Sequence, residues 1–210
     1  MNKGTSEKII EKLALAFPDA KPELVFNSEY ELLVAVILSA QCTDKRVNQV
    51  TQNLFKDYNT PEKMIKLSVE ELAEIIRPCG LNNSKARHIL SASEQIIKEY
   101  NGKVPSDFNK LKSLQGVGQK TANVVYAVAF GGDAIAVDTH VFRVSNRLGL
   151  THSKNVTECE EQLKQIIDKD KWSKTHHYLI FLGRRVCKAR KPECELCPVK
   201  DLCEKGCICS

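Results

Sequence analysis

The stretch that most constrains the fold is a turn with two glycines, LQGVGQK at 114–120, between two segments of helical pattern. The spacing of apolar residues predicts one helix over 108–114 and another over 119–130. Because glycine has no Cβ, the amide N–H groups of Gly116 and Gly118 are open to close approach by a ligand. Amides at a helix N-terminus favour an anion. The pattern therefore predicts two helices joined by a hairpin that can grip a phosphate backbone without reading its sequence.

Lys120 lies immediately inside the second of these helices. The positive end of the helix dipole there disfavours an ammonium ion and favours the free amine that can act as a nucleophile. Such a nucleophile needs an acid nearby, and Asp138 can supply one. Each residue also has a plain structural interpretation, since a lysine in a first turn is usually solvated and Asp138 is a natural N-cap. Only their conjunction with the hairpin indicates a catalytic pair.

Apolar periodicity predicts helices along the whole chain, so the expected fold class is all-α. The segment 29–40 is apolar nearly all round and is assigned to a central buried helix, although its Val and Ile content also permits a strand. Ser84 is expected to open the helix over 85–100, and capping boxes are expected at Ser68 and Thr157. The other expected helices cover 6–17, 44–58, 61–67, 69–76, 139–148, 157–167 and 172–186.

The composition is that of an ordinary globular protein. With 210 residues, 42% hydrophobic and 27% charged, the chain can bury one good core or two small ones. Its net charge of +5 suits a polyanionic partner without establishing one.

No secretory signal is visible, and the longest apolar run, from Leu32 to Ala40, is too short to span a bilayer. We therefore expect a reducing compartment and no membrane contact.

Four of the nine cysteines are grouped near the C-terminus, in the spacing C-x6-C-x2-C-x5-C: Cys187, Cys194, Cys197 and Cys203. In a reducing compartment such a group indicates metal or iron–sulfur ligation and not a disulfide framework. Four thiolates suit either a structural zinc ion or a [4Fe–4S] cluster, and the residue types leave both open. Cys207 and Cys209 lie beyond this loop and are interpreted as tail thiols.

Taken together, the hairpin, Lys120, Asp138 and the cysteine spacing resemble the endonuclease III family of helix-hairpin-helix DNA glycosylases. The lysine narrows the resemblance to members that cut the DNA strand as well as releasing the base. Gln115 stands where that family usually has proline, and Asn82 and Asn83 stand where many members carry other residues. The match covers nearly the whole chain through 37–41, Thr43-Asp44, Gly80-Leu81, 137–144 and 176–184.

The resemblance implies a two-lobed all-α fold. A helical barrel domain with the hairpin would cover 22–132, and an iron–sulfur domain would combine 1–21 with 133–210. The resemblance also implies a [4Fe–4S] cluster with a structural role, held by Cys187, Cys194, Cys197 and Cys203.

The implied activity is that of a bifunctional DNA glycosylase and AP lyase in base excision repair. Lys120 would attack C1′ of the sugar, expel an oxidised pyrimidine and form a Schiff base whose β-elimination nicks the strand. Asp138 would act on the developing positive charge and in proton transfers. The damaged nucleotide must first rotate out of the duplex. The expected DNA contacts fill the vacated space, line the hairpin or face phosphates: Gln41, Leu81, Gly116, Val117, Gly118, His140, Arg184 and Lys191.

The expected partner is double-stranded DNA with damaged pyrimidines or abasic sites, bound by a monomer at the chromosome in a prokaryotic cytoplasm. Two alternatives stay open. A monofunctional adenine-mismatch glycosylase shares the cluster spacing and the aspartate but generally lacks a lysine at position 120. A non-catalytic nucleic-acid-binding module with a zinc loop would explain the basic residues of the loop but would leave Lys120 and Asp138 without a role.

Overall fold

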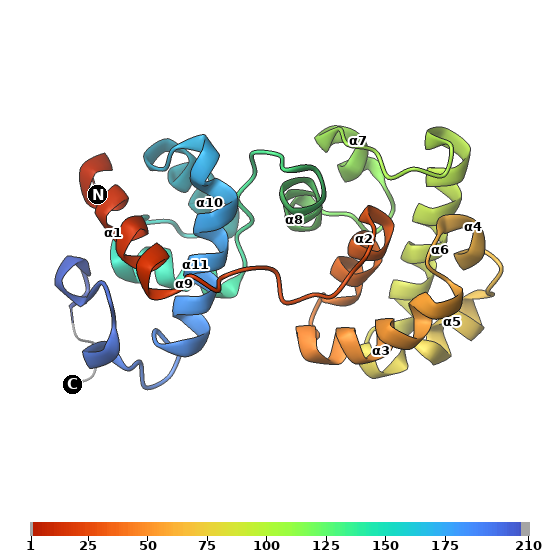
Figure 1. Cartoon of the computed structure of the whole chain (residues 1–210), viewed down its shortest axis with the longest axis horizontal. Coiled ribbons are helices and arrows are strands. Elements are labelled where there is room, and N and C mark those ends of the chain that lie inside the picture. Colours follow the sequence, from red (N-terminus) through yellow and green to blue (C-terminus); the bar gives the residue numbers. More distant parts are fainter. Residues whose placement is uncertain (1, 207–210) are drawn as a thin grey trace. The chain divides into compact units, whose positions relative to one another are not determined.

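In a computed structural model the chain is described over residues 2–206, and these residues form helices, turns and loops without a strand (Figure 1). The predicted all-α class is confirmed. The chain divides into two compact units. One is formed by the two ends of the chain, up to residue 21 and from residue 133, and the other by residues 22–132. Cys207 and Cys209 lie outside the described residues.

The unit of residues 22–132 is built around α2 (Glu29–Leu38), which is buried on nearly every face. Its apolar sequence therefore forms the central helix, and the strand interpretation is wrong. Helix α2 packs against α8, α3 and α6, and Tyr30 at its start shares a buried hydrogen bond of 2.6 Å with Ser93 of α6. The other elements are α3 (Asp44–Asp57), α4 (Pro61–Met64), α5 (Val69–Ile75), the 3-10 turn η1 (Arg77–Cys79), α6 (Asn82–Tyr100), α7 (Phe108–Ser113) and α8 (Gln119–Phe130).

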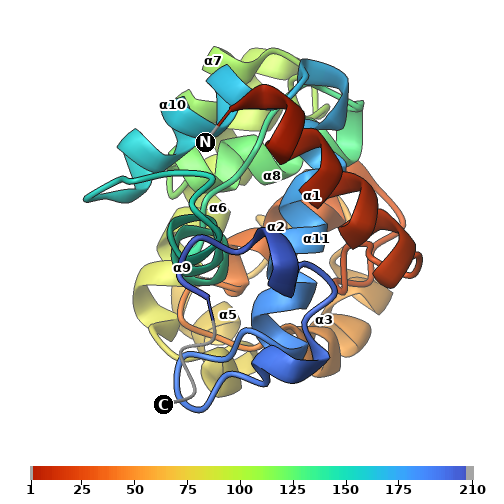
Figure 2. The ribbon, with the colours of Figure 1, turned by 90° about the vertical axis from the view of Figure 1, so that its left-hand side faces the viewer.

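The unit formed by the two chain ends has its own hydrophobic core. Helix α1 (Lys3–Ala16) buries the stripe of Ile9, Ile10 and Leu13 and lies beside α11 in both Figure 1 and Figure 2. This contact explains how a short helix far from the others in sequence is stabilised. The remaining elements are α9 (Thr139–Leu148), α10 (Val156–Ile166), α11 (Trp172–Arg185) and the 3-10 turns η2 (Lys169–Lys171), η3 (Cys194–Leu196) and η4 (Lys200–Leu202).

The helix caps show where local sequence patterns succeed and fail. The capping box predicted at Ser68 is confirmed. The capping box predicted at Thr157 is wrong, because Asn155 is the N-cap and its side chain accepts a hydrogen bond from the backbone N–H of Glu158 at 2.9 Å. Helix α10 therefore begins at Val156. Among the described residues no helix combines the length and the apolar character needed to cross a bilayer.

Candidate active site and cysteine loop

The hairpin between α7 and α8 is anchored by buried side chains. Leu114 and Val117 are buried, and the N–H of Val117 donates to the carbonyl of Leu114 at 3.1 Å. Gly116 has a φ of +75°, and a Cβ at this position would lie 2.6 Å from the Cβ of His88. A Cβ on Gly118 would meet nothing within 4 Å. Val117 thus serves to anchor the hairpin, whereas the glycine at 118 leaves its backbone approachable.

Lys120 stands in the first turn of α8, directly after the hairpin. Gly118 is the N-cap of this helix and Gln119 its first residue. The side chain of Lys120 is exposed, while Ala122 in the same turn is completely buried. The helix start is therefore fixed by the core, and it presents an amine at the positive end of the α8 dipole.

Gln41 and Leu81 are both held in the left-handed backbone region, with φ values of 54° and 50°. Leu81 is also 55% exposed although it is apolar. This conformation is uncommon for residues other than glycine, and such strain clusters at functional loops. The prediction that Ser84 opens the following helix is wrong, because α6 begins at Asn82 and Leu81 takes the N-cap position.

Asp138 belongs to the other unit, where it is the N-cap of α9. Its Oδ1 accepts a hydrogen bond from the N–H of Val141 at 2.8 Å. The bond holds the carboxylate at the helix N-terminus, where the dipole stabilises negative charge. The structural interpretation of Asp138 is thus correct, and it is compatible with a chemical role for the same carboxylate.

His140 lies within range of the charges of both Asp138 and Arg184, in the same unit. His140 lies in the first turn of α9, with its Nδ1 3.2 Å from Nη2 of Arg143. Burial lowers the pKa of His140 despite the opposing charge of Asp138, and the charges of Arg143 and Arg184 lower it further. A neutral imidazole is therefore favoured at neutral pH. Arg184 is exposed in the last turn of α11.

The four grouped cysteines line one cavity after α11, together with apolar residues of α9 and α11. Within the described residues, no group of three or more His, Cys, Asp or Glu side chains is arranged to hold a single metal ion. Thiolates that bind different irons surround a cluster, whereas zinc ligands converge on one atom. Four thiols that line one cavity are a ligand set that a [4Fe–4S] cluster can use. The cavity is lined by Cys187, Cys194, Cys197 and Cys203 with Leu148, Leu182, Val186 and Pro192, among others.

The raised pKa values of these thiols suit ligands of positively charged iron. Burial raises the pKa of Cys197 and of Cys203, and the neighbouring thiols raise it further. Without a cation, both side chains would therefore stay protonated near neutral pH. Bound iron supplies the positive charge that stabilises four thiolates in this cavity.

Two arginines of α9 that the sequence patterns did not assign hold the start of the cysteine loop. Arg147 donates to the carbonyls of Lys188 at 2.7 Å and Ala189 at 3.1 Å. Arg143 donates to the carbonyl of Cys187 at 3.1 Å. Because residues four apart share one face of a helix, these arginines reach the same loop. An arginine pair at this spacing, in a helix preceding the cysteines, is the signal that could have identified them.

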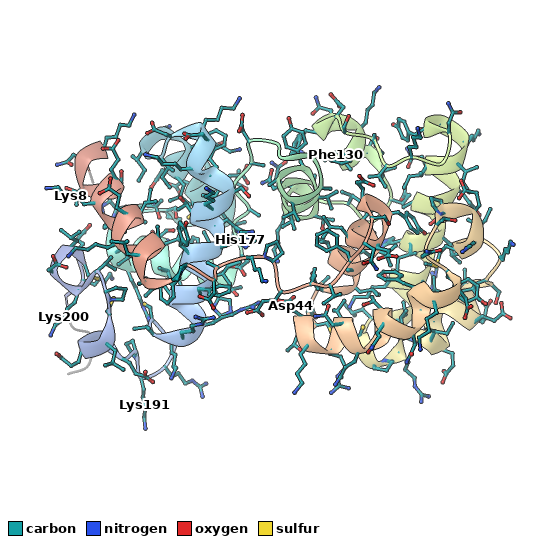
Figure 3. The ribbon with its side chains drawn as sticks, viewed as in Figure 1. Lys8, Asp44, Phe130, His177, Lys191 and Lys200 are labelled. Carbon is teal, nitrogen blue, oxygen red and sulfur yellow. The ribbon has the colours of Figure 1, made fainter. Side chains whose placement is uncertain are left out.

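The basic residues near the loop have different environments. Lys191 is exposed, has a φ of 52° and points outward from the loop (Figure 3). Lys188 is ion-paired with Glu193, and Arg185 is ion-paired with Asp19 at 2.8 Å. Lys191 is therefore better placed than Lys188 or Arg185 to meet a phosphate.

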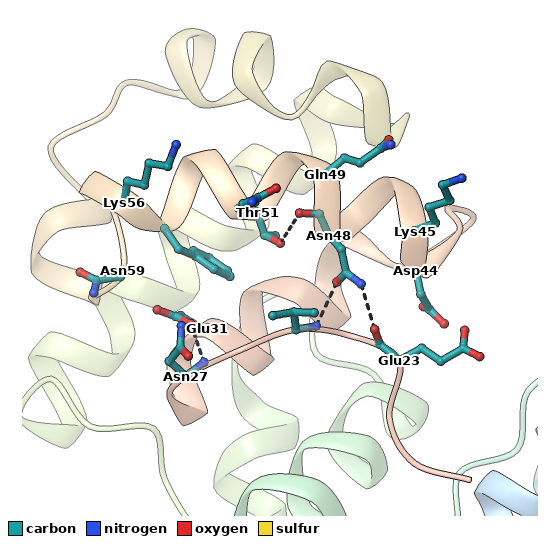
Figure 4. Close-up of a pocket in the computed structure, with 13 residues that line it drawn as sticks. Glu23, Asn27, Glu31, Asp44, Lys45, Asn48, Gln49, Thr51, Lys56 and Asn59 are labelled. Atoms are coloured by element: carbon teal, nitrogen blue, oxygen red, sulfur yellow. Dashed lines mark hydrogen bonds between the residues drawn. The ribbon is translucent and has the colours of Figure 1, made fainter. Parts of the chain in front are cut away.

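An open groove runs along α3 within the unit of residues 22–132 (Figure 4). The Asn48 side chain accepts from the N–H of Val25 at 3.0 Å and donates to the carbonyl of Glu23 at 2.9 Å. Glu31 is almost fully buried and accepts from the N–H of Asn27 at 2.6 Å. These bonds tie the segment before α2 to the helices, and none of the predicted site residues lines the groove. We interpret it as a structural feature.

The fold, the glycine hairpin with its lysine, and the cysteine-lined cavity define a helix-hairpin-helix protein of DNA repair. Residues 34–169 match the HhH-GPD superfamily of base excision DNA repair proteins. Residues 187–203 match the iron-sulfur binding domain of endonuclease III.

Relatives that match over nearly their whole length show which family within this superfamily the chain belongs to. Endonuclease III of Bacillus subtilis (strain 168) is 49% identical over 207 residues, which cover 98% of this chain and 94% of the relative. Endonuclease III of Escherichia coli (strain K12) is 46% identical over 204 residues, 97% of each chain. A solved structure of a trapped endonuclease III–DNA covalent intermediate has a TM-score of 0.93 at 50% identity, covering 98% of this chain and 97% of that one. The chain belongs to the endonuclease III family.

It is therefore a base excision repair DNA glycosylase with AP lyase activity. It binds damaged double-stranded DNA and has a [4Fe–4S] cluster as its cofactor. Neither the adenine-mismatch glycosylase nor the zinc-loop binding module is favoured, because the match to endonuclease III extends over nearly the whole chain.

Proposed function

We propose that the chain removes oxidised pyrimidines from double-stranded DNA and that Lys120 is its nucleophile. The observation that carries this proposal is the position of Lys120 in the first turn of α8, next to an approachable glycine hairpin. The hairpin amides bind a backbone phosphate. The Lys120 amine, in the first turn of the helix that follows the hairpin, is then within reach of a neighbouring sugar.

The chemistry proceeds in two stages. The Lys120 amine bonds to C1′, the bond from C1′ to the base breaks, and the base leaves with a proton. The sugar ring opens to give a Schiff base between C1′ and Nζ. Loss of a proton from C2′ then expels the 3′ phosphate, and water releases the sugar from the lysine. The Asp138 carboxylate offsets the positive charge that develops at C1′ and moves protons between these stages.

Gln41 and Leu81 occupy the space that the damaged nucleotide leaves. Extruding a nucleotide costs a few kcal/mol, and least for a damaged base. Burying the exposed apolar side chain of Leu81 among stacked bases offsets part of that cost. The remaining contacts go to the DNA backbone and its phosphates: Gly116, Gly118, His140, Arg184 and Lys191, with Val117 as the hairpin's anchor.

The cluster has a structural role in this proposal. Cys187, Cys194, Cys197 and Cys203 are its ligands, because all four line one cavity. The cluster fixes the loop that presents Lys191. The proposed reaction at Lys120 requires no metal. The unit formed by 1–21 and 133–210 is then the iron–sulfur domain, and 22–132 is the helical barrel domain. Since the curated relatives are bacterial, we place the chain at the chromosome in the cytoplasm.

A strand-cleavage assay tests the proposal on a duplex with a single thymine glycol. The wild type should release the base and nick the strand, whereas Lys120→Gln should do neither. Lys98→Gln changes an exposed lysine of α6 and should match the wild type. Normal nicking by Lys120→Gln would contradict the proposal. Release of adenine from a mismatch without nicking would instead favour the monofunctional alternative.

A further inference from the structure

The proposed reaction does not explain why Lys85 is buried. It lies in the first turn of α6 and is only 3% exposed. Its Nζ donates to the carbonyls of Leu38 and Cys79, each at 2.8 Å. A buried charge is costly unless it is well hydrogen-bonded, and an apolar side chain would fill the same space without that cost. The ammonium group therefore has a specific task.

The two carbonyls lie at the bases of the loops that carry Gln41 and Leu81. Leu38 is the last residue of α2, and Cys79 is the last residue of η1. Carbonyls at a helix end lack an intrahelical partner. The Lys85 ammonium provides one to each, at the negative end of the α2 dipole. One side chain thus joins the starts of both strained loops.

The same two loops also meet through their cysteines. The thiols of Cys42 and Cys79 interact with each other and with the charge of Lys85. Cys42 directly follows Gln41 in the chain, and Cys79 is separated from Leu81 by one glycine. The loops are therefore in contact with one another, and the ammonium lies at their junction.

We propose that Lys85 is a positioning residue that fixes the Gln41 and Leu81 loops relative to each other, so that both side chains enter the DNA together. The inference rests on the DNA-contacting role proposed for those two residues. Loops ordered before binding do not lose that conformational freedom when DNA binds, so more of the contact energy can be used to extrude the nucleotide.

Amide hydrogen exchange of the DNA-free protein tests the first half of this inference. Lys85→Met keeps the apolar stem and removes both hydrogen bonds. We expect residues 38–43 and 79–83 to exchange about tenfold faster or more, with α7 and α8 unchanged. The matched control is Lys164→Met, which removes an ammonium paired with Glu160 in the other unit and should leave both loops unchanged. Unaltered loops, or faster exchange throughout the unit, would overturn the inference.

Single-turnover nicking tests the second half. Lys85→Met should slow nicking about tenfold in the wild-type background, but should have little further effect on a Gln41→Ala/Leu81→Ala variant, since Lys85 acts through those side chains. Equal losses in both backgrounds would overturn the inference and leave the proposed function standing. A double alanine variant that nicks like the wild type would overturn the inference and the role of the two loops, while the lysine chemistry would remain.

Discussion

One carboxylate oxygen of Asp138 accepts a hydrogen bond from the backbone N–H of Val141 at 2.8 Å. The bond makes Asp138 the N-cap of α9, so one side chain has both a structural role and a proposed chemical role. Asparagine caps a helix about as well as aspartate does. Replacing the carboxylate by an amide therefore separates the two roles.

Asp138→Asn should keep the fold and lose the chemistry. We expect an unfolding temperature within about 2 °C of the wild type, because the cap remains. Single-turnover base release should be at least about a hundredfold slower, because the charge is gone. Asp138→Ala should in addition lower the free energy of unfolding by about 1 kcal/mol. Fluorescence anisotropy should show normal DNA binding by the asparagine variant, and lost binding would contradict the assigned role.

The two hairpin glycines should respond differently to alanine. Gly116→Ala should lower the free energy of unfolding by about 1–3 kcal/mol, because its φ is +75° and the new Cβ would collide with His88. In urea denaturation, Gly118→Ala should lower it by less, about 1 kcal/mol or below, because its Cβ meets nothing within 4 Å and only the weaker N-cap preference of alanine counts. It should nevertheless weaken binding to damaged and undamaged duplexes alike, because the methyl group obstructs a phosphate. Normal binding by Gly118→Ala would show that the hairpin does not grip DNA.

Arg147 should control how firmly the cluster is retained. Arg147→Lys keeps the charge but loses the planar fork that reaches the carbonyls of both Lys188 and Ala189. We expect the visible absorbance of the cluster to decay about tenfold faster in the presence of an iron chelator. Arg77→Lys, which alters a surface pair with Glu74, is the control and should decay like the wild type. Equal decay in the wild type, Arg147→Lys and Arg77→Lys would show that Arg147 does not control cluster retention.

His177 should make stability depend on pH. Burial lowers its pKa to about 3, and the neighbouring His176 contributes in the same direction. In the unfolded chain the group titrates near 6.5, so the unfolded state binds the proton first as the pH falls. This contribution to stability is therefore fully present above about pH 6.5 and decreases steadily toward pH 3.

The expected loss between pH 7.5 and pH 5 is about 2 kcal/mol of unfolding free energy from this group alone. Urea denaturation at the two pH values measures it. His177→Asn should show a correspondingly smaller difference between them. A variant with the same pH dependence as the wild type would show that His177 is not the titrating group.

Local patterns were sufficient for the fold class, because apolar periodicity and caps such as Ser68 are local signals. They also identified Lys120 and Asp138 as candidates, since a helix start and an N-cap can be recognised from neighbouring residues. Lys85 could not be recognised in this way. A lysine in the first turn of an amphipathic helix is ordinarily exposed, and this one becomes buried only when α2, η1 and α6 pack together.

The same limit applies to the backbone of Gln41 and Leu81. No sequence pattern indicates a positive φ for either residue, because tertiary contacts impose it. The error at Thr157 has a different cause. Asn155 and Thr157 are both good caps, and only the geometry decides that Asn155 reaches the N–H of Glu158.

The central claim is that Lys120 becomes covalently bonded to deoxyribose during the reaction. The most direct measurement is to incubate the iron-loaded protein with an abasic-site duplex and borohydride, and then to locate the adduct by peptide mass spectrometry. We predict a single cross-linked species, with the reduced sugar on the peptide containing Lys120 and no cross-link from Lys120→Gln. An adduct on another residue, or no adduct from protein with a complete cluster, would contradict the claim.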